Sequence, residues 1–139
     1  MQDHPPGFVS TQVRFGWIAL AIYLCIGLIL EALHGFKVAW YLDVGSETRR
    51  LLLTLGHAHG TLLALVNLVF AATSPWLAPG VAVKTSAIAL RIATVLLPAG
   101  FLLGGLWLSG NDPGVAVFLV PLGGIALMVG VIAAAVATR

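Results

Sequence analysis

The chain has 139 residues, of which 60% are hydrophobic and 9% are charged, and its mean hydropathy is +1.04. A soluble domain has roughly 45–50% apolar and about 25% charged residues, so this composition excludes a soluble enzyme domain and indicates residence in lipid. The net charge of +2 comes from seven Lys and Arg against five Asp and Glu, and because the basic residues are scattered we expect no binding to nucleic acid.

The sequence predicts one membrane domain over residues 1–139, an all-α bundle of four transmembrane helices. A hydrocarbon core about 30 Å thick is crossed by about 20 apolar residues at a rise of 1.5 Å per residue. Four such crossings and their short loops use nearly the whole chain. The expected helices cover about residues 12–35, 47–72, 81–108 and 115–138.

The first segment is expected to be a retained membrane helix. It is long and apolar enough to span, and no small-residue cleavage site follows it, which argues against a signal peptide. The chain's single cysteine, Cys25, excludes an intrachain disulfide. In the loop that follows, Trp40 and Tyr41 are aromatic residues typical of a membrane interface.

The second segment begins and ends at recognisable signals. Ser46 is the predicted N-cap, and Glu47 in the first turn interacts favourably with the helix dipole. Arg49 and Arg50 are expected to reach lipid headgroups by snorkelling. Pro75 is expected to close the segment because proline cannot continue a helix.

The third and fourth segments are separated by the turn signal GNDPG at residues 110–114. Pro98 and Pro121 are expected to kink the two helices without ending them, since neighbouring helices can satisfy the freed carbonyls. Small residues let membrane helices approach closely. The glycines predicted to form the contact between these two segments are Gly100, Gly104, Gly105, Gly123 and Gly124.

Helical spacing predicts that the first two segments meet through polar faces near the loop that joins them. His57 and His59, about ten residues into the second segment, are expected at the depth of Glu31 and His34. The stripe on the first segment comprises Leu24, Gly27, Glu31 and His34. The stripe on the second segment comprises Leu53, Gly56, His57, Gly60, Ala64 and Asn67.

His59 follows His57 by two residues, which turns its side chain about 200° away on a helix. The two histidines therefore cannot reach one centre from the same side. We expect His59 to face the third or fourth segment, or a partner subunit.

Ionisable side chains at membrane depth are unfavourable unless they pair or reach water, so they are the candidate site residues. Three roles stay open: holding helices together, a proton-linked or transported-substrate site, and a haem b or metal site. A metal would use Glu31, His34 and one of His57 or His59, and a haem would use histidines of the same set. Glu31 and His34 at i, i+3 match half of a carboxylate di-metal site, which needs a second such pair. The candidates are Glu31, His34, His57, His59 and Arg91.

Arg91 lies about nine residues into the third segment, level with Asn67 in the second. Both are polar residues inside apolar segments. We predict a direct packing contact between their side chains.

Four short motifs resemble the YgdD-like family of small four-helix membrane proteins, a family of unknown function. They occur in the family's order and span most of the chain: HGFK at 34–37, AH at 58–59, a glycine-rich stretch at 100–107 and PLGG at 121–124. The resemblance implies a four-helix membrane fold and carries His34 and His59 over as the characteristic histidines. The sequence departs from the family's pattern before both histidines, with AL at 32–33 in place of Gly-Ala and GH at 56–57 in place of Tyr-Gln.

A second, local resemblance concerns one helix. The sequence from His59 to Leu63, HGTLL, is similar to the haem-copper oxidase helix in which a His-Gly pair carries a low-spin haem ligand. The chain is far too short for such an oxidase core. The resemblance implies at most a haem-binding or oxidase-associated small subunit.

Together these features predict a small integral membrane protein of structural or accessory role, with a buried cluster of Glu31, His34, His57 and His59. The alternatives are a haem b or metal-binding redox subunit and a small proton-linked transporter or channel component. The expected partners are the lipid bilayer and other membrane subunits or further copies of the chain. We expect the bacterial inner membrane as its location and no enzymatic activity, because the chain lacks a paired nucleophile and base.

Four crossings place both termini on one side of the membrane. The basic residues near the helix ends do not decide which side, because their numbers are equal at the two ends. They are Arg14, Lys84 and Arg139 at the terminal end, and Lys37, Arg49 and Arg50 at the other.

Overall fold

The computed structural model describes residues 7–42, 45 and 47–138. Within these residues four helices are long and apolar enough to cross a membrane, and no β-strand is present. This confirms the predicted all-α bundle of four membrane-spanning helices. The predicted N-cap Ser46 and the terminal Arg139 lie outside the described residues. The four candidate spans are Phe8–Gly35, Glu47–Trp76, Val81–Leu106 and Val115–Ala137.

The helices run α1, α2, α3, α4 and α5 along the chain, and the 3₁₀ turns η2 and η3 lie on either side of α4. The first helix begins four residues before its predicted start, because Phe8 extends it and packs edge-on against Phe70 at a ring-centroid distance of 6.4 Å. The bounds are α1 Phe8–Gly35, α2 Ala39–Leu42, α3 Glu47–Thr73, η2 Ser74–Trp76, α4 Val81–Leu106, η3 Val115–Phe118 and α5 Leu119–Ala137.

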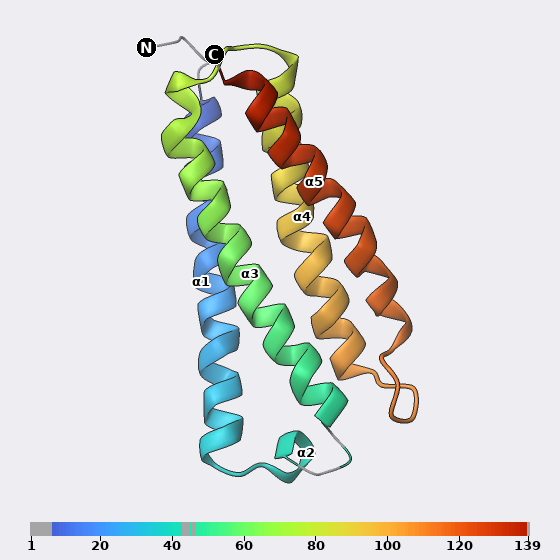
Figure 1. Cartoon of the computed structure of the whole chain (residues 1–139). Coiled ribbons are helices and arrows are strands. Elements are labelled where there is room, and N and C mark those ends of the chain that lie inside the picture. The colour runs from blue at the N-terminus through green and yellow to red at the C-terminus, as the bar shows by residue number, and fades with distance from the viewer. Residues whose placement is uncertain (1–6, 43–44, 46, 139) are drawn as a thin grey trace.

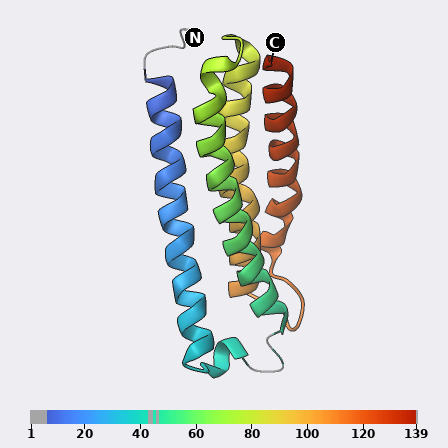
Figure 2. The same ribbon diagram turned by 60° about the vertical axis from the view of Figure 1, so that its left-hand side comes forward.

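The four long helices alternate in direction and pack in chain order (Figure 1). Helix α1 packs on α3, α3 on α4, and α4 on α5. The two middle helices are the more buried, whereas α1 and α5 form the edges, as the turned view also shows (Figure 2). Phe8, at the start of α1, packs against the cluster that contains Ala137, so α1 begins and α5 ends at one end of the bundle.

Helices α4 and α5 approach closely at glycines, but not all five glycines predicted for this contact take part in it. Gly100 lies against Val120, and Gly123 lies against the Leu97 backbone, so both belong to the α4–α5 contact as expected. Gly104 also faces the chain around Val117. The prediction was wrong for Gly105, which packs on Leu52 and Leu53 of α3, and for Gly124, which faces open space.

The two prolines behave differently. Pro98 lies inside α4 and does not end it, as predicted, and it is buried. Pro121, in contrast, is the third residue of α5, which starts at Leu119 after the η3 turn. The N–H groups of the first turn of a helix have no intrahelical partner, so a proline there breaks no hydrogen bond of the helix. Pro121 therefore lies at the start of α5 and does not kink its interior, contrary to the prediction.

The loop between α1 and α3 folds back onto the bundle through α2. Tyr41 is only 4% exposed and packs with Leu30 and Leu53, so its ring is covered by the bundle. Its place at the membrane interface stays a prediction. Trp40 stays partly exposed, and the Arg49 guanidinium lies 4.6 Å from its ring centroid and donates to its carbonyl oxygen at 3.0 Å. Arg49 is therefore engaged with the loop, and α2 covers this end of the cleft described below.

Candidate functional site

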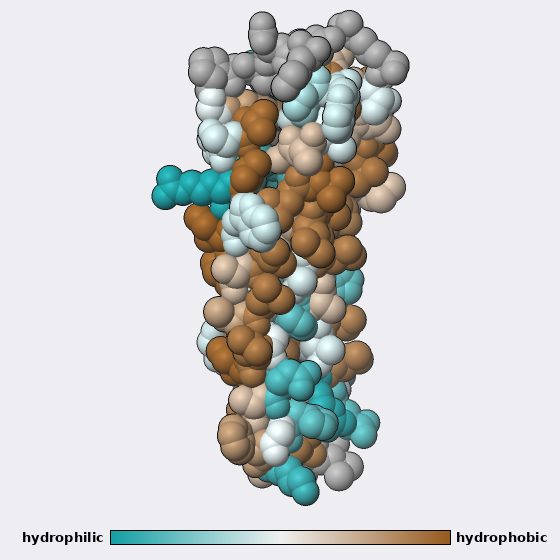
Figure 3. All heavy atoms as spheres, turned by 90° about the vertical axis from the view of Figure 1, so that its left-hand side faces the viewer, coloured by the Kyte–Doolittle hydropathy of each residue, from teal (hydrophilic) through white to brown (hydrophobic). Residues whose placement is uncertain are grey.

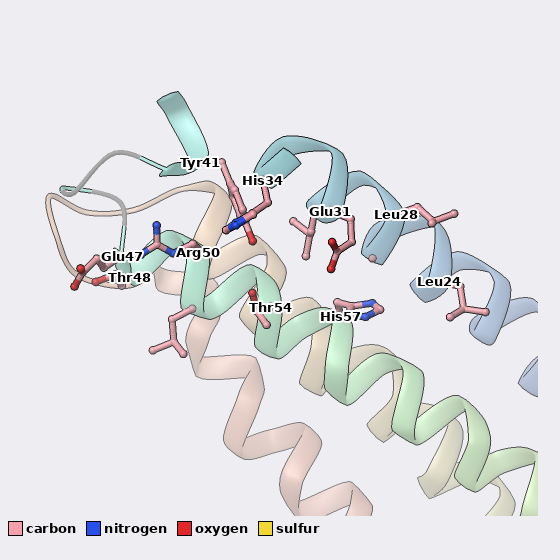
Figure 4. A pocket seen from close by; sticks show the side chains of 13 residues that line it. Leu24, Leu28, Glu31, His34, Tyr41, Glu47, Thr48, Arg50, Thr54 and His57 are labelled. Carbon is pink, nitrogen blue, oxygen red and sulfur yellow. The ribbon is translucent and has the colours of Figure 1, made fainter. Parts of the chain in front are cut away.

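A cleft of about 1150 Å³ lies between α1 and α3 at the end of the bundle that carries α2 (Figure 4). Its walls come from both helices and from α2. Apolar residues cover most of the face that α1 presents, whereas hydrophilic residues gather toward this end (Figure 3). The polar lining residues are Glu31, His34, Tyr41, Glu47, Thr48, Arg50, Thr54 and His57, and the others are Leu24, Gly27, Leu28, Leu30 and Leu51.

The cleft changes in character with depth. Glu47 and Arg50 belong to the first turn of α3, and His34 to the last turn of α1, so they lie at the mouth. Leu24 and Leu28 lie roughly 10–16 Å further along α1, given a rise of about 1.5 Å per residue. The cleft is therefore polar at its mouth and mostly apolar further along α1, where His57, packed on Gly27, is the polar exception.

The structure brings Glu31, His34 and His57 together along one cleft. All three line the cleft, and in Figure 4 the Glu31 carboxyl group and the His57 ring project into the space between α1 and α3. The predicted burial was wrong: Glu31 and His34 are exposed and His57 is half-buried. The reason is the rotation of α1, whose buried residues are Gln12, Gly16, Ala19, Tyr23, Gly27 and Leu30, so that the predicted stripe shares only Gly27 with the true one.

His57 fills the space that the missing side chain of Gly27 leaves open. Its Nδ1 lies 2.8 Å from the carbonyl oxygen of Tyr23, one turn earlier on α1. A carbonyl oxygen only accepts, so this ring nitrogen carries the proton and donates. The second ring nitrogen has no partner among the described residues, which leaves it able to accept a hydrogen bond.

Three ionisable side chains of the cleft are not bonded to other parts of the chain that the structure describes. Among the described residues, Glu31, His34 and Arg50 make no side-chain hydrogen bond and no ion pair, although they line the same space. An unpaired charge near lipid is unfavourable unless it reaches water or a partner of complementary charge. The cleft therefore offers ionic groups that a bound molecule could satisfy.

His59 does not belong to the cleft. Its Nδ1 donates to the Leu55 carbonyl oxygen of its own helix at 2.8 Å, and its ring lies 5.1 Å from that of Phe101 in α4. This confirms that it faces the third membrane helix, one of the predicted possibilities. It also separates His59 from the other predicted ligands.

The predicted metal-ligand set does not converge. In the part of the chain that the structure describes, no three His, Cys, Asp or Glu side chains are placed to hold one metal ion. Glu31, His34 and His57 come from two helices around an open cleft, and His59 points to α4. The donor set assembled here is thus a poor fit to a resident metal.

A second polar site lies deeper in the bundle, near its terminal end. We predicted a direct contact between Arg91 of α4 and Asn67 of α3, but the two side chains are instead joined by Gln12 of α1. The Arg91 Nε donates to the Gln12 side-chain oxygen at 2.6 Å, and the Gln12 amide nitrogen donates to the Asn67 side-chain oxygen. The prediction that Arg91 and Asn67 lie at the same depth in the bundle was right, and the prediction that their side chains contact each other directly was wrong.

Asn67 and Thr94 complete this network. The Asn67 amide donates to the Thr94 hydroxyl oxygen at 2.7 Å and to the Leu63 carbonyl at 2.8 Å, and the Tyr23 hydroxyl donates to the Thr94 carbonyl at 2.6 Å. Gln12, Asn67 and Thr94 are fully buried. Because its members satisfy one another across three helices, the network reads as a packing device and not as an open binding site.

Sequence reasoning missed Gln12, Tyr23 and the position of Arg50 in the cleft. A signal for the first two was present: Gln12, Gly16, Ala19 and Tyr23 recur at spacings of three and four, which is the period of a helix face. Arg50 gave no such signal, because an arginine at a helix entrance usually extends toward headgroups.

No protein-family model, curated protein or solved structure matches this chain. The similarity to the YgdD-like family therefore stays a prediction based on short motifs. The two histidines that it singles out have different surroundings, since His34 lines the cleft and His59 contacts Phe101.

Proposed function

We propose that the chain is a small accessory protein of a membrane, and that its cleft between α1 and α3 binds an amphipathic molecule taken from the bilayer. The observation that carries the proposal is the pairing of unsatisfied ionic groups at the cleft mouth with an apolar wall at membrane depth. A molecule with a polar head and a hydrocarbon chain matches both parts at once.

The apolar wall supports this choice of ligand. Leu28 is 71% exposed and Leu51 59% exposed, and they line opposite sides of the cleft on α1 and α3. In a bilayer such surfaces are covered by hydrocarbon. A chain lying between them would replace ordinary lipid contacts with contacts to two helices, while the head satisfies the charges at the mouth.

The accessory role rests on how little of the described chain lies outside the four candidate spans. The described loops are short, and α2 at one end folds back onto the bundle. Such a chain presents its surfaces to lipid and to other membrane proteins. We extend the proposal to placement in a bacterial inner membrane, with both termini on one side, as the even number of spans favours.

Two substitutions of α3 test the proposal. Leu51 and Leu62 are 59% and 58% exposed on the same helix, but only Leu51 lines the cleft. We expect Leu51→Trp to fill the cleft and to reduce the lipid that copurifies with the full chain, whereas Leu62→Trp leaves it unchanged. Native mass spectrometry of the protein released from detergent micelles measures both.

The remaining candidate functions predict other results. A haem site predicts a Soret band in the purified protein that disappears in His34→Ala or His59→Ala. A proton-linked carrier predicts flux into liposomes that Glu31→Gln abolishes while folding is retained. Either result, with lipid binding unaffected by Leu51→Trp, would overturn the proposal.

A further inference from the structure

The cleft mouth carries charges of both signs at fixed positions. Glu31 comes from α1, and Glu47 and Arg50 come from the first turn of α3. These acids and this base face one space without pairing to each other among the described residues. A head group with one charge of a single sign would satisfy only part of this set.

From this arrangement we infer that the occupant of the cleft is a phospholipid whose head carries both a primary ammonium and a phosphate, as in phosphatidylethanolamine. The inference rests on the proposed function, because it names the class of amphipathic molecule that the same cleft would take.

Each charged group of such a head has a partner of opposite sign. The ammonium carries three N–H donors and fits a carboxylate, here that of Glu31, which projects between α1 and α3, whereas Glu47 lies further out, beyond Arg50 (Figure 4). The phosphate fits the planar guanidinium of Arg50, which offers several donors in one fork. Tyr41, Thr48 and Thr54 add hydroxyl groups along the same wall.

The order of these groups along the cleft also fits a lipid. The residues at the mouth lie in the terminal turns of α1 and α3, where a head group resides. Leu24 and Leu28 continue along α1 toward the membrane interior, where an acyl chain resides. One molecule can therefore occupy the polar and apolar parts without leaving its normal depth in the bilayer.

Two common head groups fit less well. A phosphatidylglycerol head has a phosphate but no ammonium, so it would leave the Glu31 carboxylate unsatisfied beside a further negative charge. A phosphatidylcholine head has a cation without an N–H, so it cannot donate a hydrogen bond to Glu31. The site should therefore rank the ethanolamine head first.

Binding of three phospholipids with the same acyl chains to the full-length protein tests the inference, measured by native mass spectrometry titration. We expect phosphatidylethanolamine to bind about tenfold more tightly than phosphatidylcholine or phosphatidylglycerol, since the net worth of a charge-assisted hydrogen bond corresponds to at least that factor. Glu31→Gln should remove this preference while a lipid is still bound. Asp112→Asn, which alters an exposed acid outside the cleft, should leave it unchanged.

The possible failures are distinguishable. If the three lipids bind equally and Leu51→Trp displaces all of them, the proposed function holds and the inference about the head group is wrong. If Leu51→Trp displaces no lipid, both are wrong. A dimer that Leu51→Trp dissociates would show that a second copy occupies the cleft, and this would also overturn both.

Discussion

Arg91 donates a 2.6 Å hydrogen bond from its Nε to the side-chain oxygen of Gln12, so an arginine within α4 is held by an amide of α1 and not by a carboxylate. Gln12 in turn donates to Asn67 of α3. A single side chain thus connects three helices. It does so where α1 has few other polar groups to hold it against the bundle.

Replacing Gln12 by leucine should destabilise the bundle. Arg91 and Asn67 would each lose a partner in a buried setting, and we expect the free energy of unfolding to fall by about 1–3 kcal/mol. Unfolding in mixed micelles of increasing sodium dodecyl sulfate content measures this. Thr11→Ala, at an exposed neighbouring position, is the matched control.

A double variant separates this explanation from simple loss of packing. Removing both members of a hydrogen-bonded pair costs less than removing one. Gln12→Leu combined with Arg91→Leu should therefore recover part of the lost stability. If the loss in free energy of unfolding of the double variant equals the sum of the losses of the two single variants, the bond to Arg91 does not explain the effect.

The contact between Gly27 and His57 leads to a second prediction. A β-carbon at position 27 would collide with the His57 ring, which donates to the Tyr23 carbonyl at 2.8 Å. Gly27→Ala should push the ring aside, break this bond and lower stability by about 1–3 kcal/mol. Gly35→Ala, where the β-carbon meets nothing within 4 Å, should show no such loss. Thermal melting followed by circular dichroism in micelles measures both, and an equal loss in the two variants would contradict the contact.

How far the sequence predicts this structure depends on the kind of signal. The four spans follow from length and hydropathy, which the bilayer thickness constrains strongly. The face of α3 was also predictable, because Gly56, Gly60, Ala64 and Asn67 are small or polar residues that repeat at helical spacing, and all four are buried.

The orientation of α1 was not predicted, because two competing stripes lie side by side on this helix. Glu31 and His34 appeared to mark the buried face, since ionisable residues in a membrane helix usually point inward. They lie instead within the last turns of α1, close enough to the membrane surface to border an open cleft. The buried stripe through Gln12 and Tyr23 carried the weaker signal of a single amide and a tyrosine.

Two adjacent glycines of α5 provide a matched pair for the helix contact. A β-carbon at Gly123 would lie 2.5 Å from the backbone nitrogen of Leu97, which cannot move aside, whereas one at Gly124 would meet nothing within 4 Å. Gly123→Ala should therefore destabilise the α4–α5 contact by about 1–3 kcal/mol. Gly124→Ala should leave stability unchanged or raise it by up to about 1 kcal/mol, because alanine favours a helix more than glycine does.

The same titration with sodium dodecyl sulfate compares these two variants directly. The two variants have the same composition, and the two substituted positions differ only by about 100° around the axis of α5. Any difference in stability therefore reports which face of α5 packs on α4. Equal stabilities, or a larger loss for Gly124→Ala, would show that α5 presents another face to α4.

The exposed thiol of Cys25 tests the membrane placement of α1. It lies ten residues before the end of the helix, roughly 15 Å from that end, and it faces outward from the bundle. Alkylation by a maleimide needs the thiolate and therefore water, so a charged, water-soluble maleimide should label Cys25 in detergent-denatured protein but not in vesicles. In a Cys25→Ser background, Asn111→Cys in the exposed α4–α5 turn should react in vesicles whose outer face presents that turn. Rapid labelling of Cys25 in intact vesicles would contradict a lipid-facing α1, because a charged reagent does not enter the hydrocarbon that would cover this thiol.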